Sequence, residues 1–245
     1  MADALLLLHA FPVDARMWQP QLDALAGRVP IVAPNHPGFG GGDPVSDVMS
    51  MELAAASAVR ALDQAGVERA VVCGLSMGGY VALELWRRSR ERVAGFVFAN
   101  TRGGADSEEG AANRRALAER LRTEGKEFFA DVPPGLLSEH ASAELRARVR
   151  ELIADQPAEA IAAASLGMAE RPDSGPDLPD IDVPTLVVTS SDDSLIPSAV
   201  TAEMADVIPG AELAIVERAG HLSNLEGPDD FNRFLGAHLD RVGIG

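Results

Sequence analysis

The sequence predicts an α/β fold: a doubly wound, mostly parallel sheet of about six strands, with a helical lid inserted in the chain. Short apolar runs without polar alternation, typical of strands buried on both faces, alternate with segments of helical periodicity. This alternation predicts βαβ units with helices on both faces of the sheet. The 245 residues, 47% of them hydrophobic, are enough for one large domain with a substantial core.

The first hundred residues predict four strands, each an apolar run that ends at a turn. These runs cover residues 4–8, 29–33, 69–73 and 93–99. Apolar residues at helical spacing predict intervening helices over residues 17–25 and 51–65, and from residue 81 onward. Ser50 is a candidate N-cap of the second of these helices, and Gly66 is a candidate stop.

Residues 101–180 break this alternation, because they have high charge and helical periodicity but no convincing strand. We expect them to form a helical lid or cap inserted into a core made of residues 1–100 and 181–245. An insertion at the carboxyl edge of a sheet is well placed to cover a site. The alternation then resumes, with strands predicted over 185–189 and 212–216 and helices over 200–207 and 229–239.

The composition argues against several classes of partner. The formal net charge of −16 disfavours nucleic acid and anionic membrane surfaces, although a local pocket can still differ from the whole chain. No apolar run approaches the length of a membrane span, and the first residues lack the pattern of a signal peptide. We therefore expect a cytoplasmic protein without a membrane partner, either a monomer or a weak homodimer.

Metal and cofactor sites are not expected either. The one cysteine, Cys73, falls in an apolar run and is expected to be a buried, inert thiol. Cysteine and histidine residues do not cluster as zinc ligands do. The glycine-rich stretch over residues 38–42 lacks the spacing of a dinucleotide fingerprint.

The most informative stretch is Gly74-Leu75-Ser76-Met77-Gly78, which follows an apolar run and precedes a helical one. A serine on a sharp strand-to-helix turn projects out of the sheet, and such a crowded turn needs very small residues two positions before and after it. The helix that begins here directs free N–H groups and a positive dipole end toward the serine. Ser76 is therefore a candidate nucleophile.

A serine nucleophile needs a base, and the base needs an orienting carboxylate. Candidates follow the last two predicted strands: Asp192 or Asp193 after the fifth, and His221 after the sixth. The carboxyl ends of parallel strands meet at one edge of the sheet, so these side chains are expected to lie near Ser76. The residues alone leave the choice between the two aspartates open.

Taken in chain order, these motifs resemble the α/β-hydrolase superfamily over nearly the whole sequence. The matching segments are His9-Ala10-Phe11-Pro12, Gly74 to Gly79, Asp193 with Pro197, and Ala219 to Glu226. The last segment and the short helical insertion are similar to the branch that contains esterases and 3-oxoadipate enol-lactonases. This family usually begins with two antiparallel strands, which we do not expect in this chain.

The resemblance implies a role for individual residues. Ser76 would be the nucleophile and His221 the general base. Asp193 matches the acid of the family better than Asp192, because that acid usually precedes a proline by four residues, here Pro197. The backbone N–H groups of Phe11 and Met77 would form the oxyanion hole.

Other side chains are assigned less specific positions. Trp18, Met168 and Leu222 are candidate walls of a substrate pocket, with ordinary core packing as the alternative for Trp18 and Met168. Among the remaining histidines, His9 is expected to be structural. His140 and His238 are expected to be exposed to solvent, since one falls in the insertion and the other in the final helix.

The resemblance implies a serine hydrolase that cleaves small carboxylic esters or lactones through an acyl-enzyme and needs no cofactor. One alternative is another chemistry on the same residues: perhydrolase or haloperoxidase activity, or hydrolysis of a C–C bond. A different alternative is a ligand-binding receptor with this fold, since one fold supports many functions.

Overall fold

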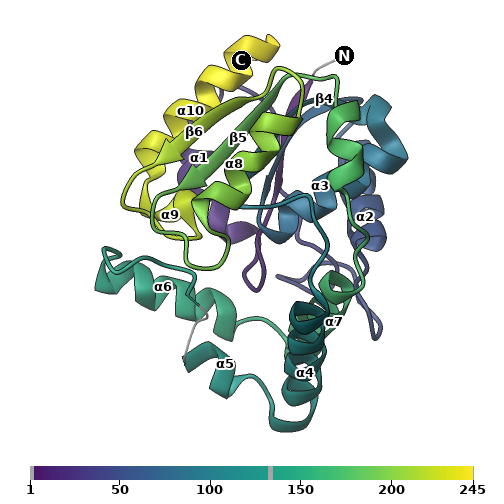
Figure 1. The fold of residues 1–245 in the computed structure, drawn as a ribbon, viewed down its shortest axis with the longest axis vertical. Helices are drawn as coiled ribbons and strands as arrows, with labels where there is room; N and C mark the ends of the chain where they lie inside the picture. Colours follow the sequence, from purple (N-terminus) through teal and green to yellow (C-terminus); the bar gives the residue numbers. More distant parts are fainter. Residues whose placement is uncertain (1–2, 132–134, 245) are drawn as a thin grey trace.

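The computed structural model describes residues 3–131 and 135–244. A single six-stranded sheet lies at the centre of the molecule (Figure 1). Every neighbouring pair of strands is parallel, in the order β2-β1-β3-β4-β5-β6. The strands are β1 (Ala4–Leu8), β2 (Ile31–Val32), β3 (Ala70–Leu75), β4 (Val93–Ala99), β5 (Thr185–Ser190) and β6 (Glu212–Val216). The predicted parallel sheet of about six strands is therefore confirmed.

Helices cover both faces of this sheet, as is required by the complete burial of β1, β3, β4 and β5 along their length. Among these helices, α1 packs against α10, and α2 packs against α3. The helices of the core are α1 (Gln19–Ala24), α2 (Met51–Gln64), α3 (Met77–Ser89), α8 (Ser198–Val207), α9 (Ser223–Glu226) and α10 (Pro228–Val242), with the 3-10 turns η1 (Ala15–Trp18) and η2 (Arg90–Arg92).

The chain between β4 and β5 is helical, and we call residues 101–180 the insert. Figure 1 shows its long helices gathered at the end of the molecule opposite the two chain termini. Within the insert, α4 and α7 pack against each other along their length. Its elements are α4 (Glu108–Glu124), α5 (Glu127–Asp131), α6 (Ala143–Ala154), α7 (Ala158–Ala169) and η3 (Gly175–Asp180).

The second strand is shorter than the apolar run over 29–33 predicts. Only Ile31 and Val32 pair with β1. Pro30 and Pro34 bound them, and a proline has no N–H to donate to the ladder.

Among the described residues, no helix is long and apolar enough to cross a membrane.

The expected exposure of His238 is wrong, because its side chain is 2% exposed. His238 shares the buried face of α10 with Phe231, Leu235 and Leu239. These positions repeat at three and four residues, which is the spacing of a helix face turned to a core. The expectation rested on the place of His238 in the final helix and did not take this spacing into account.

Burial determines the protonation state of His238. Desolvation, followed by the nearby charge of Arg241, lowers its pKa from 6.5 to about 4. Desolvation likewise lowers the pKa of the buried His9 to about 4. Both imidazoles are therefore neutral in the folded protein at neutral pH, while the unfolded chain takes up protons on them below pH 6.5.

We therefore expect the free energy of unfolding to be fully retained above pH 6.5 and to fall as the pH drops toward 4. The variant His238→Leu removes one of these groups. Its loss of stability between pH 7 and pH 5 should be smaller than that of the wild type by about 2 kcal/mol. Urea denaturation at the two pH values measures the difference.

His140→Leu, at a histidine on the surface, is the comparison variant, and an equal effect of the two substitutions would show that burial is not the cause. Equal stability of the wild type at pH 5 and pH 7 would contradict the role assigned to the buried histidines.

Candidate active site

Ser76 lies on the sharp turn between β3 and α3. Its backbone has φ 55° and ψ −113°, an unfavourable region for a residue with a side chain. Hydrogen bonds with the end of β4 and the segment after it hold this conformation: Ser76 N donates to Ala99 O at 2.9 Å, and Thr101 Oγ1 donates to Ser76 O at 2.8 Å. The serine is thus fixed at the carboxyl end of β3.

The glycines around Ser76 are required by close backbone contacts. A Cβ on Gly78 would lie 2.0 Å from Leu8 O, and a Cβ on Gly74 would lie 2.3 Å from Gly78 O. The absence of a side chain at Gly78 therefore lets the first turn of α3 approach the end of β1, and its absence at Gly74 lets the same turn pack against β3. This approach brings the segment after β1, which contains Phe11, to the same edge of the sheet as Ser76.

Asp193 and His221 meet after β5 and β6, with 2.8 Å between Asp193 Oδ2 and His221 Nδ1. Both residues are buried. Oδ1 of Asp193 accepts hydrogen bonds from the backbone N–H groups of Leu195 and Ile196 at 2.9 and 3.0 Å. Burial alone would raise the pKa of Asp193, but the hydrogen bonds from His221, Ile196 and Asn100 outweigh it and hold the pKa below its usual value.

Asn100 is a further member of this cluster that the sequence did not single out. Its Nδ2 donates to Asp193 Oδ2 at 3.0 Å and to Ser190 Oγ at 2.7 Å. Its Oδ1 accepts from Ser223 Oγ at 2.6 Å. Asn100 directly follows β4 at the carboxyl edge, and this placement is the signal by which it could have been found.

Asp192 points away from His221. Its Oδ1 accepts from Ser191 Oγ at 2.9 Å, and its Oδ2 lies 3.4 Å from Nε2 of His140 at the surface. The geometry therefore distinguishes the two aspartates, because only Asp193 contacts the imidazole of His221 in the described structure.

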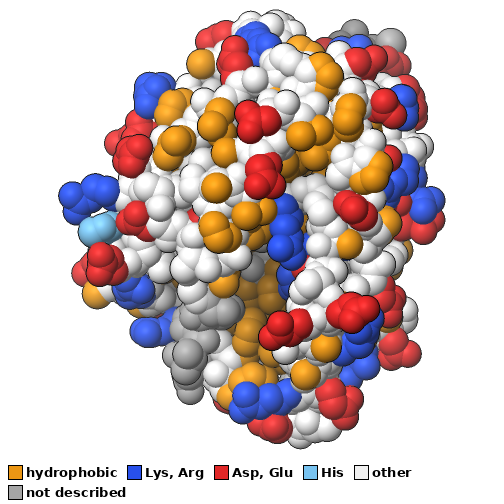
Figure 2. All heavy atoms as spheres, in the orientation of Figure 1, with side chains coloured by type: hydrophobic (Ala, Val, Ile, Leu, Met, Phe, Trp, Pro, Cys, Tyr) orange, Lys and Arg blue, Asp and Glu red, His pale blue; other side chains and the backbone are white. Residues whose placement is uncertain are grey.

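Ser76 and His221 line one cavity of about 230 Å³, whose walls are formed by residues of both the core and the insert. No hydrogen bond joins Ser76 Oγ to His221 within the described residues, which is common for such pairs without substrate. Figure 2 shows a hollow lined with hydrophobic side chains where the insert meets the rest of the molecule. The other lining residues are Phe11, Tyr80, Arg102, Arg114, Leu117, Phe129, Leu136, Met168, Leu195 and Ile196.

Of the three predicted pocket walls, only Met168 lines this cavity. Trp18 is fully buried in the core, with its ring 6.1 Å from that of Phe231. Leu222 is also fully buried and is not among the lining residues described. For Trp18 and Leu222 the expectation is corrected, because both side chains are part of the packed core.

The two expected oxyanion donors belong to segments that meet at this edge. Met77 is the first residue of α3, so its N–H group lies in the first turn, where helix N–H groups lack intrahelical acceptors. Phe11 lines the cavity. The segment that carries Phe11 is held by His9, whose Nε2 accepts from His36 N at 3.0 Å.

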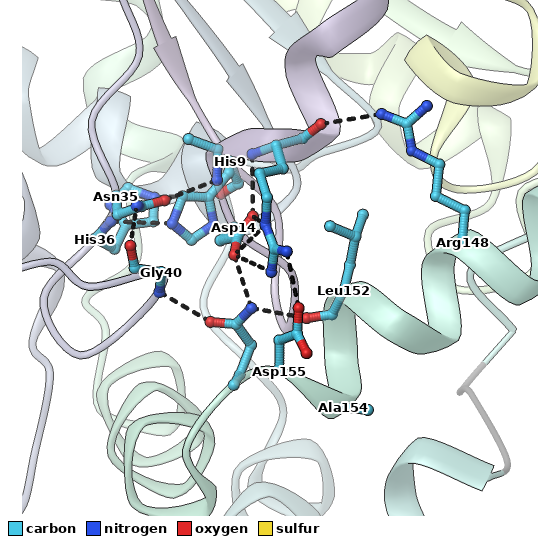
Figure 3. Close-up of polar contacts among 12 residues, drawn as sticks. His9, Asp14, Asn35, His36, Gly40, Arg148, Leu152, Ala154 and Asp155 are labelled. Atoms are coloured by element: carbon cyan, nitrogen blue, oxygen red, sulfur yellow. Dashed lines mark hydrogen bonds and ion pairs between the residues drawn. The ribbon is translucent and has the colours of Figure 1, made fainter.

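The buried Gln156 ties the insert to the core through a network of hydrogen bonds (Figure 3). Its Nε2 donates to Asp14 Oδ2 at 2.8 Å, and its Oε1 accepts from Gly40 N at 2.9 Å. Asn35 completes the network: its Oδ1 accepts from Ala15 N at 2.8 Å, and its Nδ2 donates to Gly40 O at 2.7 Å. An aspartate at position 35 could not make the contact with Gly40 O, because a carboxylate has no N–H group to donate.

A second connection joins the insert to the segment that carries His221. Glu226 Oε1 accepts from Gly220 N at 2.8 Å, and Glu226 Oε2 accepts from Ser138 Oγ at 2.6 Å. Leu222 N donates to Leu136 O at 3.0 Å.

No group of three or more histidine, cysteine or acidic residues that could hold a metal ion occurs among the residues described.

Comparisons with known proteins identify relatives of this chain. A family model described as "Alpha/beta hydrolase family" matches residues 5–234. A protein of Azorhizobium caulinodans named "Putative carbamate hydrolase RutD" is 31% identical over 90% of this chain and 85% of its own. The 3-oxoadipate enol-lactonase 1 of Acinetobacter baylyi is 27% identical over 98% of this chain and 90% of its own.

Among solved structures, a thermophilic esterase from Thermogutta terrifontis with malate bound superposes with a TM-score of 0.95. It is 36% identical to this chain, and the match covers 99% of this chain and 91% of the esterase.

The contact between α3 and β1 generates a test of the turn that carries Ser76. We expect Gly78→Ala to lower the free energy of unfolding by about 3 kcal/mol or more, because the added methyl group overlaps a backbone carbonyl that cannot move aside. Thermal denaturation measures this loss.

Gly104→Ala is the matched control, since no atom lies within 4 Å of the added methyl group. A Gly78→Ala protein as stable as Gly104→Ala would contradict the close approach.

Proposed function

Since the chain belongs to the α/β-hydrolase family, we propose that it is a serine hydrolase that cleaves small carboxylic esters or lactones through an acyl-enzyme on Ser76. The observation that carries this proposal is the Asp193–His221 hydrogen bond beside a cavity that Ser76 and His221 share. The likeness to an esterase and to an enol-lactonase supports the substrate class. In this proposal the insert is the lid of the site.

His221 acts first as a base and then as an acid. Its Nδ1–H group donates to Asp193 Oδ2, which leaves Nε2 unprotonated and able to accept the proton of Ser76 Oγ. The freed oxygen attacks the substrate carbonyl, and the proton then passes from Nε2 to the departing alkoxide. Asp193 orients the imidazole and stabilises its charged form.

The second half of the reaction repeats these steps with water. His221 removes a proton from a water molecule, the hydroxide attacks the acyl-enzyme, and Ser76 leaves with the proton that His221 returns. The backbone N–H groups of Phe11 and Met77 stabilise the oxyanion in both halves, and the dipole of α3 adds to this effect.

We expect wild-type protein to hydrolyse p-nitrophenyl esters of short acyl chains, and Ser76→Ala to lose on the order of a thousandfold or more in kcat. A spectrophotometric assay over graded acyl lengths measures both, and the optimal length reports the size of the cavity. Ser191→Ala, at an exposed serine, is the control and should stay near the wild type. Equal rates for wild type and Ser76→Ala would refute the proposed nucleophile.

The two aspartates are predicted to differ sharply in the same assay. Asp193→Asn should lower kcat on the order of a thousandfold or more, because an amide no longer holds the imidazole in the required tautomer. Asp192→Asn should retain wild-type kcat, since Asp192 contacts Ser191 and His140 at the surface. The reverse ranking would assign the acid to Asp192 instead.

A further inference from the structure

Two arginines, Arg102 and Arg114, line the same cavity as Ser76 and His221. Both pair with Asp106, Arg102 through Nη2 and Arg114 through Nε, which lies 2.5 Å from Asp106 Oδ2. A third arginine, Arg171, contacts both oxygens of the same carboxylate at 3.0 Å. We call these four residues the arginine cluster.

The arginine cluster carries excess positive charge. Asp106 is almost completely buried, with 2% of its side chain exposed. Burial acts to raise its pKa, but the hydrogen bonds and charges of Arg171 and Arg114 hold the pKa at about 2. Three guanidinium groups therefore share one carboxylate, in a chain whose formal net charge is −16.

The three arginines differ in how their donors are used. Arg171 uses both terminal nitrogens within the protein: Nη1 donates to Met168 O at 2.8 Å and Nη2 donates to Gly104 O at 2.9 Å, whereas its Nε is buried without a partner among the described residues. Its guanidinium lies 4.0 Å from the centre of the Tyr80 ring. Arg171 does not line the cavity, and it anchors Asp106.

Arg102 and Arg114, in contrast, line the cavity and keep terminal donors without an acceptor among the described residues. Within the described residues, Nε of Arg102 is buried without a partner, and neither Nη1 nor Nη2 of Arg114 donates to any group. Positively charged donors that have no protein acceptor and lie beside a cavity favour the binding of an anion there. The planar guanidinium is well suited to bind a carboxylate with two parallel hydrogen bonds.

The remainder of the cavity is mainly apolar, with Leu117, Phe129 and Met168 among its walls. Its occupant should therefore combine a short apolar body with one anionic end. We propose that the substrate is an ester or lactone whose acyl part carries a second, free carboxylate, which binds Arg102 and Arg114 while the reacting carbonyl lies at Ser76. This inference rests on the proposed hydrolysis and specifies its substrate class.

The test compares two esters that differ in one terminal group. Mono-p-nitrophenyl glutarate carries a free carboxylate, and p-nitrophenyl valerate has an acyl chain of the same length without the charge. Wild-type protein should show a kcat/KM for the glutarate ester that is on the order of tenfold or more above that for the valerate ester.

The variant Arg114→Met retains most of the side-chain length and removes the charge. The ratio of the two kcat/KM values should then fall toward one, mainly through a higher KM for the glutarate ester, and Arg114→Lys should restore part of the ratio. Arg115→Met, at an exposed arginine of the same helix, is the matched control and should leave the ratio unchanged. Melting temperatures verify that each variant is folded.

The outcomes separate the inference from the proposed function. Hydrolysis of both esters with no preference for the glutarate ester, or with a preference that Arg114→Met leaves intact, overturns the inference alone. If neither ester is hydrolysed, the proposed function fails, and calorimetric titration with monoethyl glutarate decides the carboxylate site. Binding weakened on the order of tenfold in Arg114→Met supports the site, and absence of binding to wild type overturns it.

Discussion

The contact between the first turn of α3 and the end of β1 is the constraint on which the candidate site depends. It places the backbone of Gly78 against the carbonyl of Leu8, at a distance that excludes any side chain. The serine turn of β3 and the segment after β1 are consequently held at one edge of the sheet. Parallel strands place the segments after β4, β5 and β6 at the same edge, so the site is a consequence of packing in the core.

The polar part of the site is ordered by a chain of hydrogen bonds around Asp193. Asn100 connects this carboxylate to Ser190 and to Ser223, so residues that follow β4, β5 and β6 are joined in one buried network. A buried carboxylate whose acceptor positions are all used is held in one orientation, and its ionised form is stabilised. The orientation of His221 is then set through Asp193 by residues that include Leu195 and Ile196, which also line the cavity.

The sequence was most informative where chemistry and periodicity coincide. The apolar runs predicted the strands because buried parallel strands tolerate few polar residues, and the glycines around Ser76 identified the turn because their spacing has a steric cause. The insert was recognised from its helical periodicity, but its contacts were not, since they join residues far apart in the chain, such as Asp14 and Gln156. Trp18 and Leu222 were misplaced for a related reason, because proximity to a motif in sequence does not say which way a side chain points.

The Gln156 network has a consequence for exchanging inserts between members of this family. Gln156 donates to Asp14 and accepts from Gly40, and the segment that contains Asp14 follows directly after Phe11. A transplanted insert without an equivalent amide would leave Asp14 with one hydrogen bond fewer, next to the segment expected to hold the oxyanion. An insert transplanted onto this core to change specificity would therefore need a glutamine at the position equivalent to Gln156.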